Sequence, residues 1–395
     1  MTPSIGGWCP GRCEAQEIDS GVYMLRIADY RVKFFDSVWE VPEGVTYNAY
    51  LVAGPEKLVL VGLAERRHAA ALLELLRRAA GPRDLDAVVL QHTSHLAAAE
   101  HLLREAGGVR LYTLPGLGEP PGLRAAVLEP GEGISLGGGW RLFLPTGQPP
   151  WPGGILVLEP HGLVFTGDLF SGYSTPPIMV DREDVELFSY YTYFMRKYFA
   201  TVIGPYRGRL QRLLEKLAAL GPRLLAPLHG LALEARAAEA LQLYTGWARG
   251  RLDPGKAVAV YLDLDSGPVA EAVERLAEAL EEKDVDVAVY GFTETRRPNI
   301  SEILGDAVDA AYIVMGFGRP WDGGAPPPLS FLVNLLCSHA ASRQRLLILH
   351  GPGATSPAAL LAARLQACGM EALGALEPRG DWLHRALGKL LSGPG

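Results

Sequence analysis

The sequence predicts two domains in succession, of the α+β and α/β classes: an αββα sandwich over residues 1–250 and a doubly wound parallel sheet over residues 256–395. Two observations predict this. The first part has strand-like segments separated by turn signals such as Gly54-Pro55, with helices between later strands. The second part alternates strictly between continuous apolar strands and helices, as buried parallel sheets require. The polar, Pro/Gly-containing segment 250–255 is the predicted domain boundary.

In the first domain, alternating and apolar runs predict strands that form antiparallel hairpins and then continue between helices. The predicted strands are 22–27, 30–35, 46–52, 57–61, 84–91, 109–113, around 134, 140–144, 155–158 and 163–165. The predicted helices are 67–80, 96–106, 186–202, 206–220 and 232–249.

The second domain is about 140 residues, the usual size of one doubly wound sheet. Its predicted strands are 257–262, 285–290, 311–315, 345–349 and 372–376. Its predicted helices are 269–283, 300–307, 329–339 and 357–367, followed by a final helix.

Composition bounds the partners and the compartment. A net charge of -7 provides no basic surface, which argues against nucleic acid as a partner. No apolar run reaches membrane-spanning length, and the first residues lack a charged segment followed by an apolar one. We therefore expect a cytoplasmic protein that does not enter membranes.

Four cysteines do not make a disulfide framework in a chain of 395 residues. Cys9 and Cys13 are spaced to hold a metal or to form a redox pair, but no second pair nearby completes a tetrahedral site. We expect these cysteines to be structural or incidental thiols.

Three predicted strands of the first domain end in a metal-ligating side chain. His92 follows the apolar run 87–91, Asp168 follows 163–167, and His229 follows 224–228. A buried strand that ends in a polar cluster presents those side chains to a site, so these three are the candidate ligands, with His95 as a fourth.

At this point the chain resembles the flavodiiron proteins, in which a metallo-β-lactamase-like di-iron domain is fused to a flavodoxin-like domain. The resemblance spans nearly the whole chain. It rests on the segments 42–52, 198–205 and 226–230, on Trp151-Pro152 and Gly167-Asp168-Leu-Phe170, on the strand end at His92, and on Trp321-Asp-Gly-Gly324. Their order and spacing agree with the family's.

The resemblance implies reduction of dioxygen or nitric oxide at two non-haem irons, with an FMN delivering electrons. It also implies a head-to-tail homodimer and a redox partner protein. The aromatic segment Phe188–Met195 fits a buried helix as well as a subunit interface.

The family's first metal motif, His-x-Glu-x-Asp-His, is incomplete here. His92 matches its first histidine, but Ser94 and Leu96 stand where the carboxylates belong and Ala97 where the second histidine belongs. The histidine before Trp-Pro is replaced by Pro150. Asp168 matches the bridging aspartate and His229 the last histidine. Since carboxylates offset much of the repulsion between two divalent ions, we expect no normal di-iron centre.

Two readings of the remaining ligands stay open. His92, Asp168 and His229, with His95, are a donor set for one iron or zinc ion. Alternatively, they are hydrogen-bonded remnants in a repacked pocket. A β-lactamase-type hydrolase ranks low, because the His-x-His-x-Asp-His pattern is absent at this strand end.

The flavin loops are altered unequally. In the first loop Ser266 and Gly267 are placed to bind the FMN phosphate, but Asp263 and Asp265 oppose its charge. The second loop keeps Trp321 as the stacking aromatic, with Asp322 and Gly323. The third loop keeps the glycine pattern at Gly353 without the family's aromatic residues.

We therefore expect FMN binding to be weak or absent. Two classes of function remain: a redox enzyme with a remodelled site, or a non-catalytic paralogue that acts as a dimerising or partner-binding subunit.

Overall fold

The computed structural model of the protein describes residues 11–81, 84–105, 108–263, 267–340 and 342–392. The chain divides into two compact units, Met1–Phe199 with Tyr206–Thr245 and Ala200–Pro205 with Gly246–Gly395. The domain limits 1–250 and 256–395 stay a prediction.

The first unit contains two sheets. The larger sheet runs in the order β1, β2, β5, β6, β7, β8, β9, antiparallel as far as β6 and parallel beyond it. Its central strands are almost wholly buried, because the sheet is covered on both faces. The strands are β1 (Arg12–Asp19), β2 (Val22–Asp29), β5 (Val45–Ala53), β6 (Leu58–Val61), β7 (Ala87–Val89), β8 (Arg110–Thr113) and β9 (Ala126–Val127).

The smaller sheet runs in the order β10 to β14, antiparallel except for the parallel pair β13 and β14. Its strands are β10 (Gly133–Gly137), β11 (Trp140–Phe143), β12 (Leu156–Glu159), β13 (Leu163–Gly167) and β14 (Leu224–Pro227).

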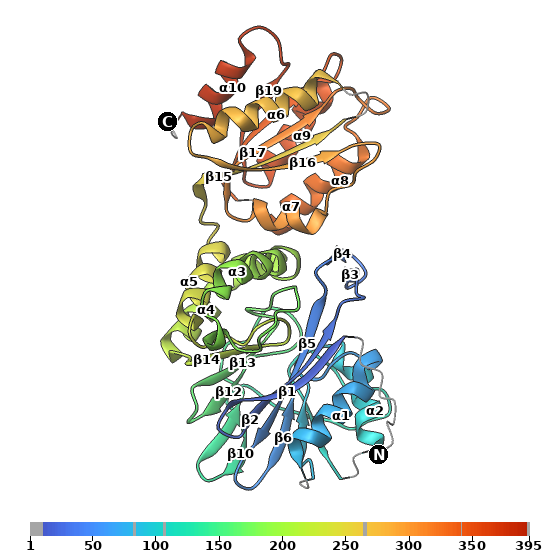
Figure 1. Ribbon diagram of the computed structural model, residues 1–395, viewed down its shortest axis with the longest axis vertical. Helices are drawn as coiled ribbons and strands as arrows, with labels where there is room; N and C mark the ends of the chain where they lie inside the picture. The colour runs from blue at the N-terminus through green and yellow to red at the C-terminus, as the bar shows by residue number, and fades with distance from the viewer. Residues whose placement is uncertain (1–10, 82–83, 106–107, 264–266, 341, 393–395) are drawn as a thin grey trace. The chain divides into compact units, whose positions relative to one another are not determined.

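Helices cover the outer faces of the two sheets, which completes the αββα sandwich (Figure 1). The larger sheet is covered by η1 (Arg66–His68), α1 (Ala69–Ala80) and α2 (His95–Glu105). The smaller sheet carries α3 (Leu187–Tyr198), α4 (Gln211–Leu220) and α5 (Ala237–Ala248). Short helical turns are η2 (Asp181–Glu183), η3 (Phe199–Ile203) and η4 (Gly204–Arg209).

Two predicted elements of this unit are shorter than expected. The predicted helix 232–249 begins only at Ala237, because Ala232 and Leu233 form β-bridges and the buried Asp181 carboxylate accepts the backbone N–H groups of residues 234–236. The predicted strand 30–35 is reduced to β3 (Phe34–Phe35), which pairs with β4 (Trp39–Glu40).

The second unit is a parallel sheet in the order β16, β15, β17, β18, β19. This is the flavodoxin-like order 2-1-3-4-5, as predicted. Its strands are β15 (Asp253–Leu262), β16 (Asp286–Phe292), β17 (Ala310–Phe317), β18 (Arg345–His350) and β19 (Glu371–Leu376).

The helices of this unit are α6 (Pro268–Glu281), α7 (Ile300–Ala307), α8 (Pro327–Leu335), α9 (Thr355–Ala367) and α10 (Trp382–Leu391), with the π-helical turn η5 (Leu336–Ala340) after α8. Buried faces of α6 and α10 pack together against the sheet.

The expectation of structural or incidental thiols, made for Cys9 and Cys13, was wrong for Cys13, and a disulfide that the sequence did not predict joins the other two cysteines. Cys337, in η5, and Cys368, just after α9, form a disulfide with a Cα–Cα distance of 5.3 Å. Cys13 is also disulfide-bonded, whereas Cys9 lies outside the described residues. Spacing along the sequence did not reveal the Cys337–Cys368 pair, because the fold brings together helix ends that are 31 residues apart.

No helix in the described part of the chain is long and apolar enough to cross a membrane.

Candidate functional site

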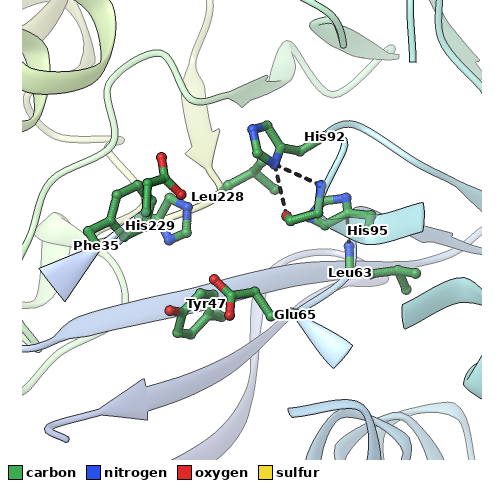
Figure 2. Close-up of a pocket in the computed structure, with 10 residues that line it drawn as sticks. Phe35, Tyr47, Leu63, Glu65, His92, His95, Leu228 and His229 are labelled. Atoms are coloured by element: carbon green, nitrogen blue, oxygen red, sulfur yellow. Dashed lines mark hydrogen bonds between the residues drawn. The ribbon is translucent and has the colours of Figure 1, made fainter. Parts of the chain in front are cut away.

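The strand ends of the first unit surround one small cavity. Its volume is about 20 Å³, room for a single water-sized group. His92 and His95 line it from the turn after β7 and the start of α2, and His229 lines it after β14 (Figure 2). The complete lining is Phe35, Asp36, Tyr47, Leu63, Glu65, His92, Ser94, His95, Leu228 and His229.

His92 is held by the turn that leads into α2. Its Nδ1 atom accepts the backbone N–H of Ser94 at 3.2 Å and lies 2.8 Å from the Ser94 hydroxyl. A backbone N–H only donates, so Nδ1 is the acceptor nitrogen and the neutral ring carries its proton on Nε2. This Nε2–H group faces Asp168 Oδ2 at 3.7 Å, which is too long for a hydrogen bond.

His95 is fixed in the same tautomer. Its Nδ1 accepts the backbone N–H groups of Leu63 at 3.3 Å and Gln91 at 3.4 Å. Burial lowers the pKa of His95 well below its ordinary value, and the neighbouring His92 and His229 add to the effect. The His95 ring is therefore neutral at pH 7, with its proton on Nε2.

His229 has the opposite tautomer. Its Nδ1 lies 2.6 Å from the carbonyl oxygen of Thr46, which only accepts, so Nδ1 carries the proton and Nε2 has a lone pair. Burial lowers the pKa of His229 to about 4, although Asp168 opposes this shift. The ring is packed edge-on against Phe35 and Tyr47.

Asp168 follows β13 and is buried. Its Oδ1 accepts the hydroxyl of Tyr198 at 2.9 Å. Tyr198, from α3, is itself buried against Phe35 and Tyr173. One oxygen of the only carboxylate that matches the family motif is thus engaged with the protein.

Two carboxylates at the cavity were not predicted. Asp36 lies at the tip of the β3–β4 hairpin, where Asp36 and Ser37 have φ of 49° and 60° and Val38 donates to the Phe35 carbonyl. Removal from water raises the pKa of Asp36, and nearby Asp168 adds to the shift while His92 opposes it. Glu65 follows β6 and has a pKa raised by burial.

The strand-end rule that identified His92 also applies to Glu65, because β6 and β7 are neighbours in the sheet. The sequence could not identify Asp36 in this way, because Asp36 does not follow a long apolar strand and is positioned by a tight hairpin turn.

In the second unit, the two ends of the loop after β15 are joined by a hydrogen bond to the side chain of Asp263. Asp263 Oδ1 accepts the backbone N–H of Gly267, the N-cap residue of α6, at 3.1 Å. Ser266 and Asp265 lie outside the described residues.

The loop after β17 forms a two-residue β-turn. Trp321 and Gly324 exchange backbone hydrogen bonds of 2.9 and 2.8 Å around Asp322 and Gly323, whose φ values are 46° and 78°. This turn leaves the Trp321 side chain half exposed. Gly353, with φ of 76°, lies in the loop after β18.

No protein-family model matches the chain. Individual proteins do. A flavo di-iron protein from Thermotoga maritima, solved as a mutant, superposes with a TM-score of 0.84 at 25% identity, covering 96% of this chain and 98% of its own. These likenesses, over nearly the whole chain, support membership of the flavodiiron protein family.

Other relatives agree. Coenzyme F420H2 oxidase from Methanothermobacter marburgensis is 27% identical over 368 residues, 82% of each chain. Rubredoxin oxygen:oxidoreductase from Desulfovibrio gigas has a TM-score of 0.82 at 19% identity, covering 95% of this chain and 97% of its own, a likeness in fold. The predicted family and fold are confirmed.

The donor groups do not fit the family's two irons. A metal ion bound at Nε2 of His92 or His95 would require the ring proton to lie on Nδ1. There the Nδ1–H group would face a backbone N–H group, and two hydrogen-bond donors would point at each other. Only His229 presents a lone pair on Nε2. Within the described ranges, no three His, Cys, Asp or Glu side chains are grouped as metal ligands.

The described residues of the first loop, Asp263 and Gly267, are not arranged to bind the FMN phosphate. The backbone amide at the start of α6, the group that binds an anion at a helix N-terminus, is occupied by the Asp263 carboxylate. The cofactor roles of Gly267, Trp321, Asp322, Gly323 and Gly353 stay predictions, as do the metal roles of His92, His95, Asp168 and His229.

Proposed function

We propose that this protein is a flavodiiron-type scaffold that does not assemble the two-iron centre, and that its reduction of dioxygen or nitric oxide is therefore impaired. The observation that carries the proposal is the tautomer of two cavity histidines. His92 and His95 both use Nδ1 to accept backbone N–H groups, so their Nε2 atoms are hydrogen-bond donors rather than ligands.

The carboxylates support the same conclusion. Ser94 and Leu96 replace two anions of the family motif, and Asp168 is held by Tyr198. At an effective dielectric constant of about 20, two unit charges 4 Å apart repel each other by about 4 kcal/mol, and two divalent ions by about four times as much. Asp36 and Glu65 add negative charge at the cavity, but their raised pKa values show that burial already disfavours their ionised forms.

A single iron or zinc ion is the remodelled form that the cavity favours. His229 offers its Nε2 lone pair, Asp36 lines the same cavity, and Asp168 is close enough to affect the pKa values of both.

Elemental analysis after anaerobic reconstitution with iron tests the proposal. We expect at most one iron per chain and no spectroscopic coupling between irons. A matched variant, Glu186→Gln, removes an acidic residue near the start of α3 and away from the cavity lining, and should leave the iron content unchanged. A stoichiometry near two, with coupled di-iron spectra, would refute the proposal.

A second candidate function is a non-catalytic, dimerising or partner-binding subunit. On α3, Phe188, Tyr191 and Met195 are buried within the first unit, but Tyr190 is 65% exposed. Tyr190 lines an open groove of about 230 Å³ with Pro176, Pro177 and other residues. An exposed aromatic beside apolar groove walls is typical of an interface anchor.

Oxygen consumption separates the two candidates. Relatives are named as a coenzyme F420H2 oxidase and a rubredoxin oxygen:oxidoreductase, so reduced F420 and reduced rubredoxin are the electron donors to supply. Turnover of either donor with iron-loaded protein supports a redox enzyme. No turnover, together with a homodimer by light scattering, supports the subunit role.

A further inference from the structure

Three buried polar residues of β5 lie in the segment 42–52, and the metal donors do not explain them. Thr46, Asn48 and Tyr50 alternate along the strand, so their side chains lie on one face of it. Their exposed fractions are 0, 1 and 0%. Apolar side chains would fill a buried strand without the cost of removing polar groups from water, so these polar groups need partners.

Their partners lie in the loop after β14, which carries a cavity histidine. Thr46 Oγ1 accepts the backbone N–H of Gly230 at 2.6 Å. Asn48 Nδ2 donates to the carbonyl oxygens of Pro227 at 3.0 Å and Gly230 at 3.1 Å. Tyr50 donates its hydroxyl to the Pro227 carbonyl oxygen at 2.6 Å. One face of β5 therefore holds the backbone on both sides of that histidine.

The edge of β5 receives this loop as well. β6 pairs with residues 50–53 of β5, so the first half of that edge is left to another segment. The loop takes this place: the Asn48 N–H donates to the Leu228 carbonyl oxygen at 2.8 Å, and His229 Nδ1 donates to the Thr46 carbonyl oxygen at 2.6 Å. The imidazole N–H thus stands where a partner strand would place a backbone N–H.

This contact decides the tautomer of His229. A histidine ring without a fixed partner carries its proton mainly on Nε2, which leaves the lone pair on Nδ1. The Thr46 carbonyl oxygen only accepts, so it holds the proton on Nδ1 and leaves the lone pair on Nε2, in a side chain that lines the cavity. The carbonyl oxygen can do so only while the loop stays against β5.

We infer that Thr46 and Asn48 are positioning residues: their side chains hold the loop against β5 and so keep His229 in the tautomer whose Nε2 can bind a metal ion. This deepens the proposed function, because it names the residues that prepare the ready ligand of the single-ion form. It rests on that function only for the metal, since the tautomer is a property of the metal-free protein.

Nitrogen NMR of the full-length, metal-free protein with isotope-labelled histidine measures the tautomer at pH 7, and His229→Gln assigns the His229 signals. We expect the proton on Nδ1 in the wild type. Thr46→Val keeps the shape of the side chain but leaves the Gly230 N–H without its acceptor, and should move the ring toward the Nε2-protonated form. Thr46→Ser keeps the hydroxyl and should restore the wild-type signals.

Asn48→Ala is the second variant, in case Thr46→Val does not fold. It removes both side-chain donors to the loop and should change the tautomer in the same direction. Thr113→Val is the matched control, because Thr113 is buried in β8 of the same sheet and its hydroxyl has no hydrogen-bond partner among the described residues. It should leave the His229 signals unchanged.

Zinc titration with an indicator dye provides the second readout. Thr46→Val should lower zinc affinity by about tenfold, whereas Thr46→Ser and Thr113→Val should not change it. Three results would overturn the inference: a wild-type ring with its proton on Nε2, folded Thr46→Val and Asn48→Ala variants with the wild-type tautomer, or a changed tautomer with unchanged zinc affinity. Binding of two irons, or of no metal, would refute the proposed function or its single-ion form, and the tautomers alone would then decide the inference.

Discussion

The ligand-facing edges of the two units have changed in opposite directions. In the first unit, Ser94 and Leu96 stand where the family places carboxylates, so two anions of the motif are missing where cations would bind, although Asp36 and Glu65 line the cavity. In the second unit, Asp263 adds a carboxylate where an anion would bind. Both changes oppose the charge of the family's cofactor, while the strands that carry these edges keep their pairing.

The two edges differ in how deeply the altered residues are buried. The first edge is enclosed: His95 is 3% exposed and His229 8% exposed, and each has a fixed hydrogen bond. The second edge consists of surface loops, with Trp321 half exposed. Altered ligands in an interior become part of the packing, whereas altered loops change binding and leave the core alone.

The largest expected effect concerns the support of the second unit. Replacing both Cys337 and Cys368 by Ser removes a cross-link that closes a span of 31 residues, and should lower the stability of this unit by about 3–4 kcal/mol. Hydrogen exchange read by mass spectrometry during denaturant unfolding localises the loss. The first unit serves as the internal control. A change below about 1 kcal/mol in the free energy of unfolding of the second unit would show that the disulfide contributes little to its stability.

Acid should act on the first unit. Burial lowers the pKa of His68 from 6.5 to about 4, and the side chain is 1% exposed. Because the folded pKa lies below the unfolded one, the unfolded chain binds more protons between these values. The stability contribution is therefore complete above pH 6.5 and is lost as pH falls toward 4, by about 3 kcal/mol. The pKa of His229, also about 4, acts in the same direction.

Urea unfolding of the first unit from pH 7 to pH 4.5 measures this effect. His68→Gln should flatten the profile, and His384→Gln, on α10 of the second unit, is the matched control. If the free energy of unfolding of the wild-type first unit does not fall between pH 6.5 and 4.5, His68 is not held neutral by burial.

Metal binding should depend unequally on the cavity histidines. If one ion binds, His229→Ala should reduce its affinity by at least about tenfold, because His229 alone presents a ready Nε2 lone pair. His92→Ala should have a smaller effect, since His92 Nδ1 is engaged by Ser94. Zinc and iron titrations with an indicator dye give both affinities, and equal losses in the two variants would show that the His92 tautomer changes on binding.

The smallest effect on stability is expected at Tyr190. Tyr190→Ser alters an exposed side chain, and should change the free energy of unfolding by less than about 0.5 kcal/mol. If the groove beside it is a subunit interface, the same change should shift a dimer toward monomer in light scattering. Leu360→Ser, which alters another exposed apolar side chain, should leave the oligomeric state unchanged. A strict wild-type monomer at micromolar concentration would remove the dimer hypothesis.

The residues alone were enough to predict the fold class, the resemblance to the flavodiiron proteins and the strand ends that meet at the cavity. Apolar strands that end at His92, Asp168 and His229 predict that these side chains are presented to a site, because side chains at the ends of buried strands are exposed to ligands. That the ends of strands from two different sheets meet at one cavity was decided by the packing of the sheets. The βα alternation after residue 256 predicts a parallel, doubly wound sheet, since each parallel connection needs a helix; the flavodoxin-like order follows only from the resemblance.

Only the tertiary structure decided what these residues do there. The tautomers of His92 and His95 depend on backbone N–H groups. One of these belongs to Leu63, in the segment after β6, whereas both histidines follow β7. Asp36 reaches the cavity through a turn with positive φ, and Cys337 meets Cys368 across 31 residues. Sequence periodicity reports which face of an element is buried, but hydrogen-bond direction and contacts between distant segments are set by the packing of whole elements.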